Sequence, residues 1–250
     1  MHGLGEILLH LPAGQLASAA VIFFLSALLQ GMTGFGFVLF SAPLLSMVTG
    51  AKVAIPLITC TGFINAITLT LSNRKGIRFK EVGCLLPGSF LAIPLGAWFL
   101  HHYDDHVLRL GLAAIIFLFA VYSMLGKMRV HLKSDTWAIP FGMLSGFSGG
   151  AFNANAPPVI VYAQLRQWDQ KGFKGSLSAY LVVNSAAVMV SHHVAGLSNM
   201  GVYITAVELF PIMFVGSLIG LRITGRMSTS SFNKIIQGML IMLSILLVLK

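Results

Sequence analysis

Residues 31–43 read GMTGFGFVLFSAP, and residues 146–158 read GFSGGAFNANAPP. Aligned at a shift of 115 positions, both stretches place glycines and a hydroxyl within apolar sequence, followed by a proline. Glycine and proline break a membrane helix, and the freed backbone N–H and C=O groups then need partners in the protein or in a water-lined cavity. Two such breaks at corresponding positions of two halves are typical of the substrate site of a secondary transporter.

The composition around these stretches is that of a membrane protein. The chain has 250 residues, of which 56% are apolar and 9% are charged, whereas a soluble domain is usually about 25% charged. These values predict an all-α integral membrane protein with a single transmembrane domain over residues 1–250 and the lipid bilayer as its partner. The formal charge of +9 comes from basic residues between apolar spans, so we expect no nucleic-acid partner.

Ten apolar segments follow one another along the chain. Four of them, the first, second, sixth and seventh, have only about 15 residues, while a full membrane span needs about 20. Each Gly-rich stretch is therefore either the tip of a re-entrant hairpin or the junction of two short, tilted spans, and the sequence leaves both open. The expected segments are residues 15–30, 36–50, 53–72, 82–100, 108–126, 136–150, 153–167, 175–195, 202–222 and 232–249.

The basic residues predict how the chain is oriented. Most of the 16 Lys and Arg residues lie in four connections that fall on one side when the segments are threaded in order. Because cytoplasmic loops of membrane proteins carry an excess of Lys and Arg, we expect a multi-pass protein of the inner or plasma membrane with both termini outside. The connections placed in the cytoplasm are residues 73–81, 127–135, 166–174 and 223–231.

The similarity between the two halves extends beyond the Gly-rich stretches. Asn65 matches Asn184 at a shift of 119, and the Pro87–Gly96 segment matches Pro211–Gly220 at a shift of 124. The sequence thus predicts two repeats of about five segments each, over residues 15–126 and 136–249, with short or broken helices at the Gly-rich motifs. An odd number of segments in each repeat gives the two copies opposite topology, as in many secondary transporters.

These stretches resemble the TauE/SafE family of sulfite-exporter-like membrane permeases. The resemblance is carried by the motifs at 31–45 (GMTGFGFVLFSAPLL) and 146–165 (GFSGGAFNANAPPVIVYAQL) and by the two Pro…Gly segments. It implies two repeats around Gly-rich, Pro-containing segments and the transport of sulfite, sulfonates or related organosulfur anions. The second motif departs from the family's more glycine-rich pattern at Asn153, Ala154 and Asn155, a difference that bears on the substrate more than on the fold.

A small anion at mid-membrane depth needs hydrogen-bond donors. The N-terminus of a helix supplies free N–H groups and about half a unit of positive charge without a buried cation. Helices that begin near residues 35 and 151 would supply this at the two motifs, with Asn65 and Asn184 in support. An alternative is that the glycines serve only close helix packing and the asparagines only structure. The candidate substrate-binding residues are Thr33, Gly34, Phe35, Gly36, Asn65, Ser148, Gly149, Gly150, Asn153, Asn155 and Asn184, with Gln30, Tyr162 and Gln164 as weaker candidates.

Glu208 is the one acid clearly inside an apolar segment. Acids within the membrane often relay protons in coupled transporters, so Glu208 is the candidate for proton coupling. It lies near the outer end of its segment, where an acid can also face water or cap a helix.

The sequence therefore predicts a secondary transporter, an exporter of a small anion, which works by alternating access between two inverted repeats. A cation or metal exporter using His192, His193 and Glu208 stays open, as does a membrane-embedded enzyme. Adjacent histidines point to different sides of a helix, and no zinc, P-loop or hydrolase motif is present. We expect no enzyme, metal or cofactor, and a homo-oligomer stays open.

Overall fold

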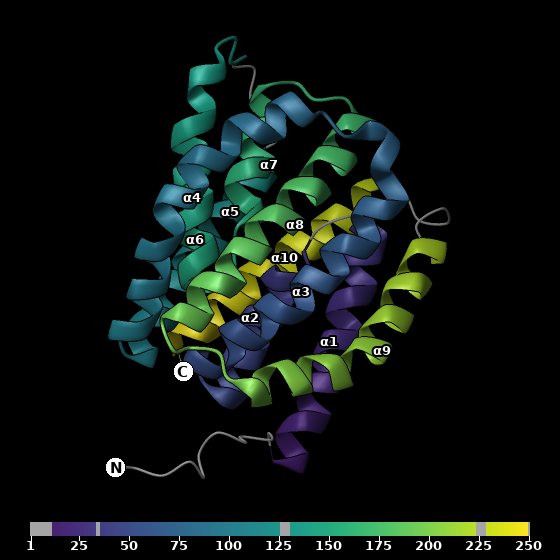
Figure 1. Ribbon diagram of the computed structural model, residues 1–250. Coiled ribbons are helices and arrows are strands. Elements are labelled where there is room, and N and C mark those ends of the chain that lie inside the picture. The colour runs from purple at the N-terminus through teal and green to yellow at the C-terminus, as the bar shows by residue number, and fades with distance from the viewer. Residues whose placement is uncertain (1–11, 34–35, 126–130, 224–228, 250) are drawn as a thin grey trace.

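The computed structural model describes residues 12–33, 36–125, 131–223 and 229–249 (Figure 1). The side chains of Thr33, Leu125, Gln170 and residues 229–236 lie outside this description. Ten α-helices and two short 3-10 helices occupy the described residues. They are α1 (Ala13–Thr33), α2 (Phe37–Thr49), α3 (Ala51–Asn73), η2 (Arg74–Gly76), α4 (Phe79–His102), α5 (Asp105–Leu125), η3 (Asp135–Trp137), α6 (Ala138–Phe152), α7 (Ala156–Leu165), α8 (Gln170–Val194), α9 (Met200–Ile223) and α10 (Thr229–Leu249).

Among the described residues, six helices are long and apolar enough to cross a membrane, namely α1, α3, α4, α5, α8 and α9. The prediction of an all-α, multi-pass membrane protein is therefore confirmed. One length was wrong: the first segment was expected over residues 15–30, but α1 has 21 residues and is a full span.

The helix ends separate into two groups (Figure 1). The connections α3–α4, α5–α6 and α7–α8 lie at one end of the bundle, and α2–α3, α4–α5 and α8–α9 lie at the other. The first group contains three of the expected cytoplasmic connections. In one of them, α5–α6, residues 126–130 are outside the described part of the chain. The basic connections thus share one end of the molecule, which is called the basic end below.

Both Gly-rich motifs break the helices, as the sequence predicted. Between α1 and α2 the chain turns at Gly36, whose φ of 106° favours glycine. Between α6 and α7 it turns at Asn153, with a φ of 54°; asparagine tolerates this region better than most residues. The helices after the breaks have 13 and 10 residues, or about 20 and 15 Å, so neither α2 nor α7 crosses the full membrane thickness of about 30 Å.

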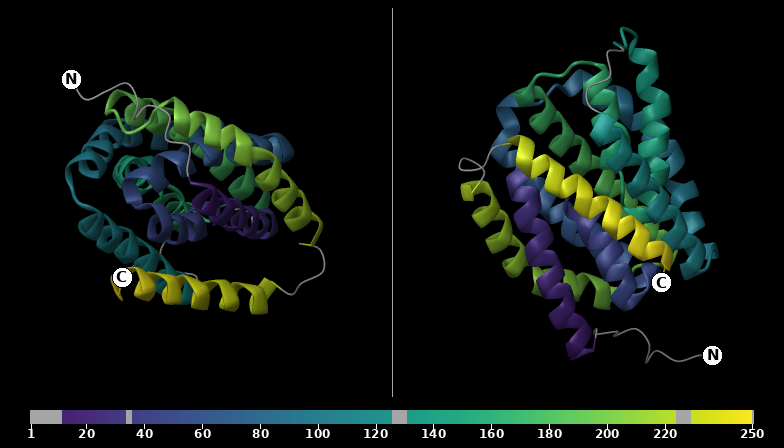
Figure 2. Two further views of the ribbon diagram at one scale, coloured as in Figure 1. Left: turned by 90° about the horizontal axis from the view of Figure 1, so that it is seen from below. Right: turned by 180° about the vertical axis from the view of Figure 1, so that it is seen from behind.

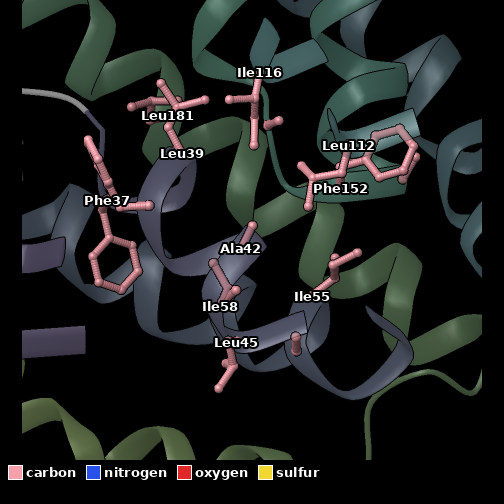
Figure 3. Close-up of a cluster of buried hydrophobic side chains, with 14 of the residues drawn as sticks. Phe37, Leu39, Ala42, Leu45, Ile55, Ile58, Leu112, Ile116, Phe152 and Leu181 are labelled. Carbon is pink, nitrogen blue, oxygen red and sulfur yellow. The ribbon is translucent and has the colours of Figure 1, made fainter. Parts of the chain in front are cut away.

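The two short helices diverge from the middle of the bundle. The α2 helix ends where α3 begins, at the end away from the basic connections, and α7 ends toward α8, at the basic end (Figure 1). Their N-termini therefore both lie inward. In Figure 3, Phe37 and Leu45 of α2 lie among side chains of α3, α5 and α8, and all of the labelled residues are buried.

Helix packing relates the halves at a shift that differs from the first motif alignment. A Cβ on Gly31 would lie 3.0 Å from the Cα of Gly220, and one on Gly150 would lie 3.1 Å from the Cα of Gly96. Gly31 thus corresponds to Gly150, at a shift of 119, and not to Gly146 as aligned from the sequence. The same shift relates the end of α1 to that of α6 and the starts of α2 and α3 to those of α7 and α8.

The helix pairs follow the same correspondence. The α1 helix packs on α9 as α6 packs on α4, and α3 packs on its counterpart α8. The α5 helix packs on its counterpart α10, which runs along one flank of the bundle (Figure 2). That the two halves form an inverted repeat in the membrane stays a prediction.

Candidate functional site

A central cavity lies where the two breaks meet. It has a volume of about 30 Å³, room for about two water molecules. The first turns of α2 and α7 line it, together with the middle of α3 and α8. The lining residues are Gln30, Gly36, Phe37, Val38, Leu39, Gly62, Ala66, Asn153, Ala154, Asn155, Ala156, Pro157, Leu181 and Ser185.

Both halves contribute matching positions to this cavity. At the shift of 119, five positions of the first half pair with five of the second, and all ten line the cavity. The pairs are Gly36 with Asn155, Phe37 with Ala156, Val38 with Pro157, Gly62 with Leu181, and Ala66 with Ser185. The cavity therefore lies on the boundary between the two halves, where relative movement of the halves would change its shape.

Backbone polarity makes the cavity favourable for negative charge. Neither α2 nor α7 has a side-chain hydrogen bond at its N-cap, and the first N–H groups of a helix have no partner within the helix. Two helix dipoles thus direct positive ends at one place. The donors are unequal, because Pro157 and Pro158 in the first turn of α7 have no N–H, so α2 supplies most of the backbone N–H groups.

Asn153 is the polar side chain best placed to meet a ligand. It is 1% exposed and lines the cavity, and its Oδ1 is buried without a hydrogen-bond partner. Its Nδ2 lies 3.5 Å from where a Cβ on Gly62 would be. A buried, unpartnered amide oxygen is rare in proteins, and this one belongs to a residue that lines a cavity with room for water.

Asn155 is held by a network of buried side chains. Its Nδ2 donates to Oδ1 of Asn184 at 2.7 Å, and Asn184 donates through Nδ2 to Tyr180 OH at 3.1 Å and to Ser89 Oγ. Tyr180 OH donates to Ser145 Oγ at 2.8 Å, and Ser145 Oγ donates to the backbone oxygen of Asn155 at 2.6 Å. The circuit fixes the start of α7 against α4, α6 and α8.

The first half also has a buried amide pair, but the partner of its asparagine comes from a different position. Asn65 donates through Nδ2 to Oε1 of Gln30 at 2.7 Å, so its partner lies on α1 and not at the start of α2. At the shift of 119, Gln30 corresponds to Gly149, and Asn155 corresponds to Gly36. A Cβ on Gly149 would lie 3.1 Å from the Cβ of Asn155, so in the second half a side chain at the Gln30 position would crowd Asn155.

The adjacent glycines of the second motif have different surroundings. A Cβ on Gly149 would meet Asn155 and Asn184, beside the cavity, whereas Gly150 packs against α4. The hydroxyl of Ser148 donates to the backbone oxygen of Ala154 at 2.8 Å and does not line the cavity. Of the predicted residues, Gly36, Asn153, Asn155 and the weaker candidate Gln30 line the cavity, while Asn65, Asn184 and Gly149 support its walls.

Several sequence candidates lie elsewhere. Gly34, Phe35 and the side chain of Thr33 are outside the described part of the chain. Glu208 is exposed on α9 and does not line the cavity. His192 and His193 diverge, since Nε2 of His192 is 2.7 Å from the backbone oxygen of Gly150 and Nδ1 of His193 is 3.2 Å from Tyr203 OH.

Sequence reasoning missed an ionic cluster at the basic end. Arg166, at the end of α7, donates to Oδ1 of Asp135 at 2.6 Å and to Oε1 of Glu81 at 3.3 Å. The OH of Tyr162 donates to Oε2 of Glu81 at 3.4 Å. A hydrogen bond from Lys80 and its charge, with help from Arg166, lower the pKa of Asp135. The cluster links α7 to α4 and η3. No signal in the sequence pointed to it, because its members are far apart along the chain.

The two asparagine pairs predict unequal losses of stability. Asn184→Ala removes three hydrogen bonds and Asn65→Ala removes one within the described residues. Interhelical hydrogen bonds in membranes average about 0.6 kcal/mol, so we expect a loss of about 2 kcal/mol for Asn184→Ala and about 0.6 kcal/mol for Asn65→Ala. Unfolding of purified protein in detergent measures both, and equal losses would contradict the assigned network.

Comparison with known proteins agrees with this architecture. The family described as Sulfite exporter TauE/SafE matches residues 19–247, nearly the whole chain. No match was found among curated proteins or solved structures.

Proposed function

Because the chain belongs to the TauE/SafE sulfite exporter family of membrane transporters, we propose that it exports a small sulfur oxyanion, sulfite or a sulfonate, by alternating access. The family match and six helices able to cross a membrane in the described part of the chain make it a multi-pass membrane transporter. We further place this transporter in the plasma membrane.

One observation carries the proposal: two helix N-termini without side-chain caps border one cavity at the boundary between the halves. Such termini favour an anion without a buried cation, and the residues that line this cavity include no Lys or Arg. A compact head group with several oxygens can accept hydrogen bonds from the N–H groups of α2 and from the amide N–H of Asn153. Sulfite and sulfonate have such a head group.

The Oδ1 atom of Asn153, which has no hydrogen-bond partner, predicts which protonation state of the anion binds more tightly. An amide oxygen accepts hydrogen bonds and repels a bare oxyanion oxygen. Hydrogen sulfite carries a proton that Asn153 can accept, and a fully ionised dianion does not. We therefore expect hydrogen sulfite to bind more tightly than the sulfite dianion.

Alternating access follows from the place of the cavity. A volume of about 30 Å³ is small for a sulfur oxyanion, so the halves must separate slightly to admit one. If the halves are inverted repeats, a rocking movement would expose the site at each end in turn. With the basic end in the cytoplasm, both termini lie outside, and outward movement of anion is export.

Flux through purified protein in proteoliposomes tests the proposal. We expect saturable sulfite or sulfonate flux and a rise in the unfolding temperature of about 5 °C at a hundredfold excess over the dissociation constant. Carboxylates and divalent metals are the comparison ligands. Stabilisation by metals alone would support the metal-exporter alternative, and absence of anion flux and anion stabilisation together would refute the proposal.

A further inference from the structure

A second cavity lies at the end of the bundle away from the basic connections. It has a volume of about 200 Å³, several times that of the central cavity. Parts of α1, α2, α3 and α9 and the α8–α9 connection enclose it. Its lining residues are Gln15, Thr49, Lys52, Val53, Leu57, Leu197, Asn199, Val202 and Thr205.

This cavity and the central one lie along the same helix. Val53 and Leu57 of α3 line the larger cavity, and Gly62 and Ala66 of α3 line the central one. Gly62 lies five positions after Leu57, a rise of about 7.5 Å along a helix. Because a helix turns by about 100° per residue, Val53 and Leu57 lie on one face of α3 and Gly62 and Ala66 on the opposite face, so the two cavities border opposite sides of this helix.

The corresponding junction at the basic end is closed. At the shift of 119, Val53 and Leu57 correspond to Gly172 and Ser176 of α8. The backbone N–H of Arg78 donates to Ser176 Oγ at 2.8 Å, the Arg78 side chain forms an ion pair with Asp169, and a Cβ on Gly172 would lie 2.5 Å from Nε of Arg78. The connection before α4 is thus seated on the first turns of α8.

At the other end, the related connection leaves the cavity open. Residues 198–202 correspond to residues 74–78 at the shift of 124, and Asn199 and Val202 line the cavity beside α3. The same helix–loop junction is therefore closed at the basic end and open at the opposite end.

Lys52 gives the open cavity a positive charge. Its side chain is exposed, and its Nζ donates one hydrogen bond, to the backbone oxygen of His101 at 2.9 Å, which leaves donors for a ligand. The nearby Asp105 lies 3.7 Å from Arg109 and accepts from the N–H of Ala51 at 3.1 Å. The acid is thus balanced within its own cluster, and Lys52 is the charged residue among those that line the cavity.

We propose that this cavity is an outer vestibule, a second site for the transported small oxyanion, and that Lys52 attracts the anion there. The inference rests on the proposed function for the identity of the anion. Arg78, Asp169 and Ser176 then form the closed gate at the cytoplasmic end.

Cysteine labelling tests the vestibule. In a Cys60→Ala, Cys84→Ala background, Val53→Cys is exposed to membrane-impermeant thiol reagents added from outside, with Ser176→Cys as its counterpart exposed from the cytoplasmic side. We expect Val53→Cys to react at least about tenfold faster than Ser176→Cys, because a closed, hydrogen-bonded junction excludes the reagent. Equal or slower reaction at Val53→Cys would overturn the open vestibule.

Charge selectivity tests the role of Lys52. We expect an anionic sulfonate reagent to label Val53→Cys faster than a cationic ammonium reagent of similar size, and Lys52→Gln to remove this preference. Lys171→Gln, at the corresponding position of α8, is the matched control and should leave it unchanged. A preference that survives Lys52→Gln would overturn the role of Lys52.

The same labelling separates this inference from the proposed function. Slower labelling of Val53→Cys in excess sulfite would place the substrate in the vestibule. If labelling is fast and anion-selective but sulfite neither slows it nor is transported, the vestibule stands and sulfite is the wrong substrate. If sulfite is transported without slowing the labelling, the vestibule is no binding site for it.

Discussion

Gly62→Ala should abolish most anion transport while leaving the protein as stable as the wild type or slightly more stable. The added Cβ would lie 3.5 Å from Nδ2 of Asn153 and 3.9 Å from Phe37, ordinary contacts that the empty protein accommodates. It would occupy space in a cavity of about 30 Å³ that the anion needs. Because overpacking costs about 1–3 kcal/mol, we expect sulfite flux to fall by about ten- to a hundredfold.

A glycine without neighbours provides the control. A Cβ on Gly83 of α4 would meet nothing within 4 Å, so Gly83→Ala shares the gain in helix propensity, about 0.5–1 kcal/mol, without touching the cavity. Flux in proteoliposomes and unfolding temperature in detergent are measured for both variants. Wild-type flux in Gly62→Ala, at equal reconstitution, would show that the anion does not use this cavity.

Gly149→Ala and Gly150→Ala should fail in different ways although the residues are adjacent. A Cβ on Gly150 would lie 2.9 Å from the backbone N of Ala97 and closer still to the backbone oxygen of Ile93. Neither backbone can move without separating α4 from α6. We expect Gly150→Ala to cost about 3 kcal/mol and to lower the unfolding temperature by about 6–12 °C.

At Gly149 the obstacles are side chains. The Cβ would lie 3.1 Å from both the Cβ of Asn155 and Oδ1 of Asn184, so the amide pair must shift by a few tenths of an ångström. We expect Gly149→Ala to lower the unfolding temperature by about 2 °C, the equivalent of one membrane hydrogen bond, and sulfite flux by about tenfold, because Asn155 borders the cavity. The reverse pattern, with Gly150→Ala losing only flux and Gly149→Ala only stability, would contradict the assignment.

The sequence predicted the fold well because hydrophobicity and charge act locally. Apolar runs define the helices, and glycine with proline defines the breaks at Gly36 and Asn153. The length of α1 was missed because the Gly-rich motif that begins at Gly31 predicted a break there, whereas the helix continues to Thr33.

The site was predictable only in part, because it depends on contacts between distant segments. The Gly-rich motifs located the cavity, and the matched asparagines located its supports. Motif alignment at a shift of 115 hid the fact that Gly150, and not Gly146, takes the place of Gly31. The exchange of Gln30 for Asn155 as amide partner and the role of Gly62 required coordinates, since both depend on side chains that meet across helices.

Binding of selenite, a heavier analogue of sulfite with anomalous scattering, tests the central claim most directly. Crystals of the purified protein soaked with selenite should give an anomalous peak between the first turns of α2 and α7, within hydrogen-bond distance of the N–H groups at residues 37–39 and of the Asn153 side chain. The Gly62→Ala variant should lose that peak. A saturating soak that shows no peak between these turns, or shows peaks only elsewhere in the protein, would contradict the account.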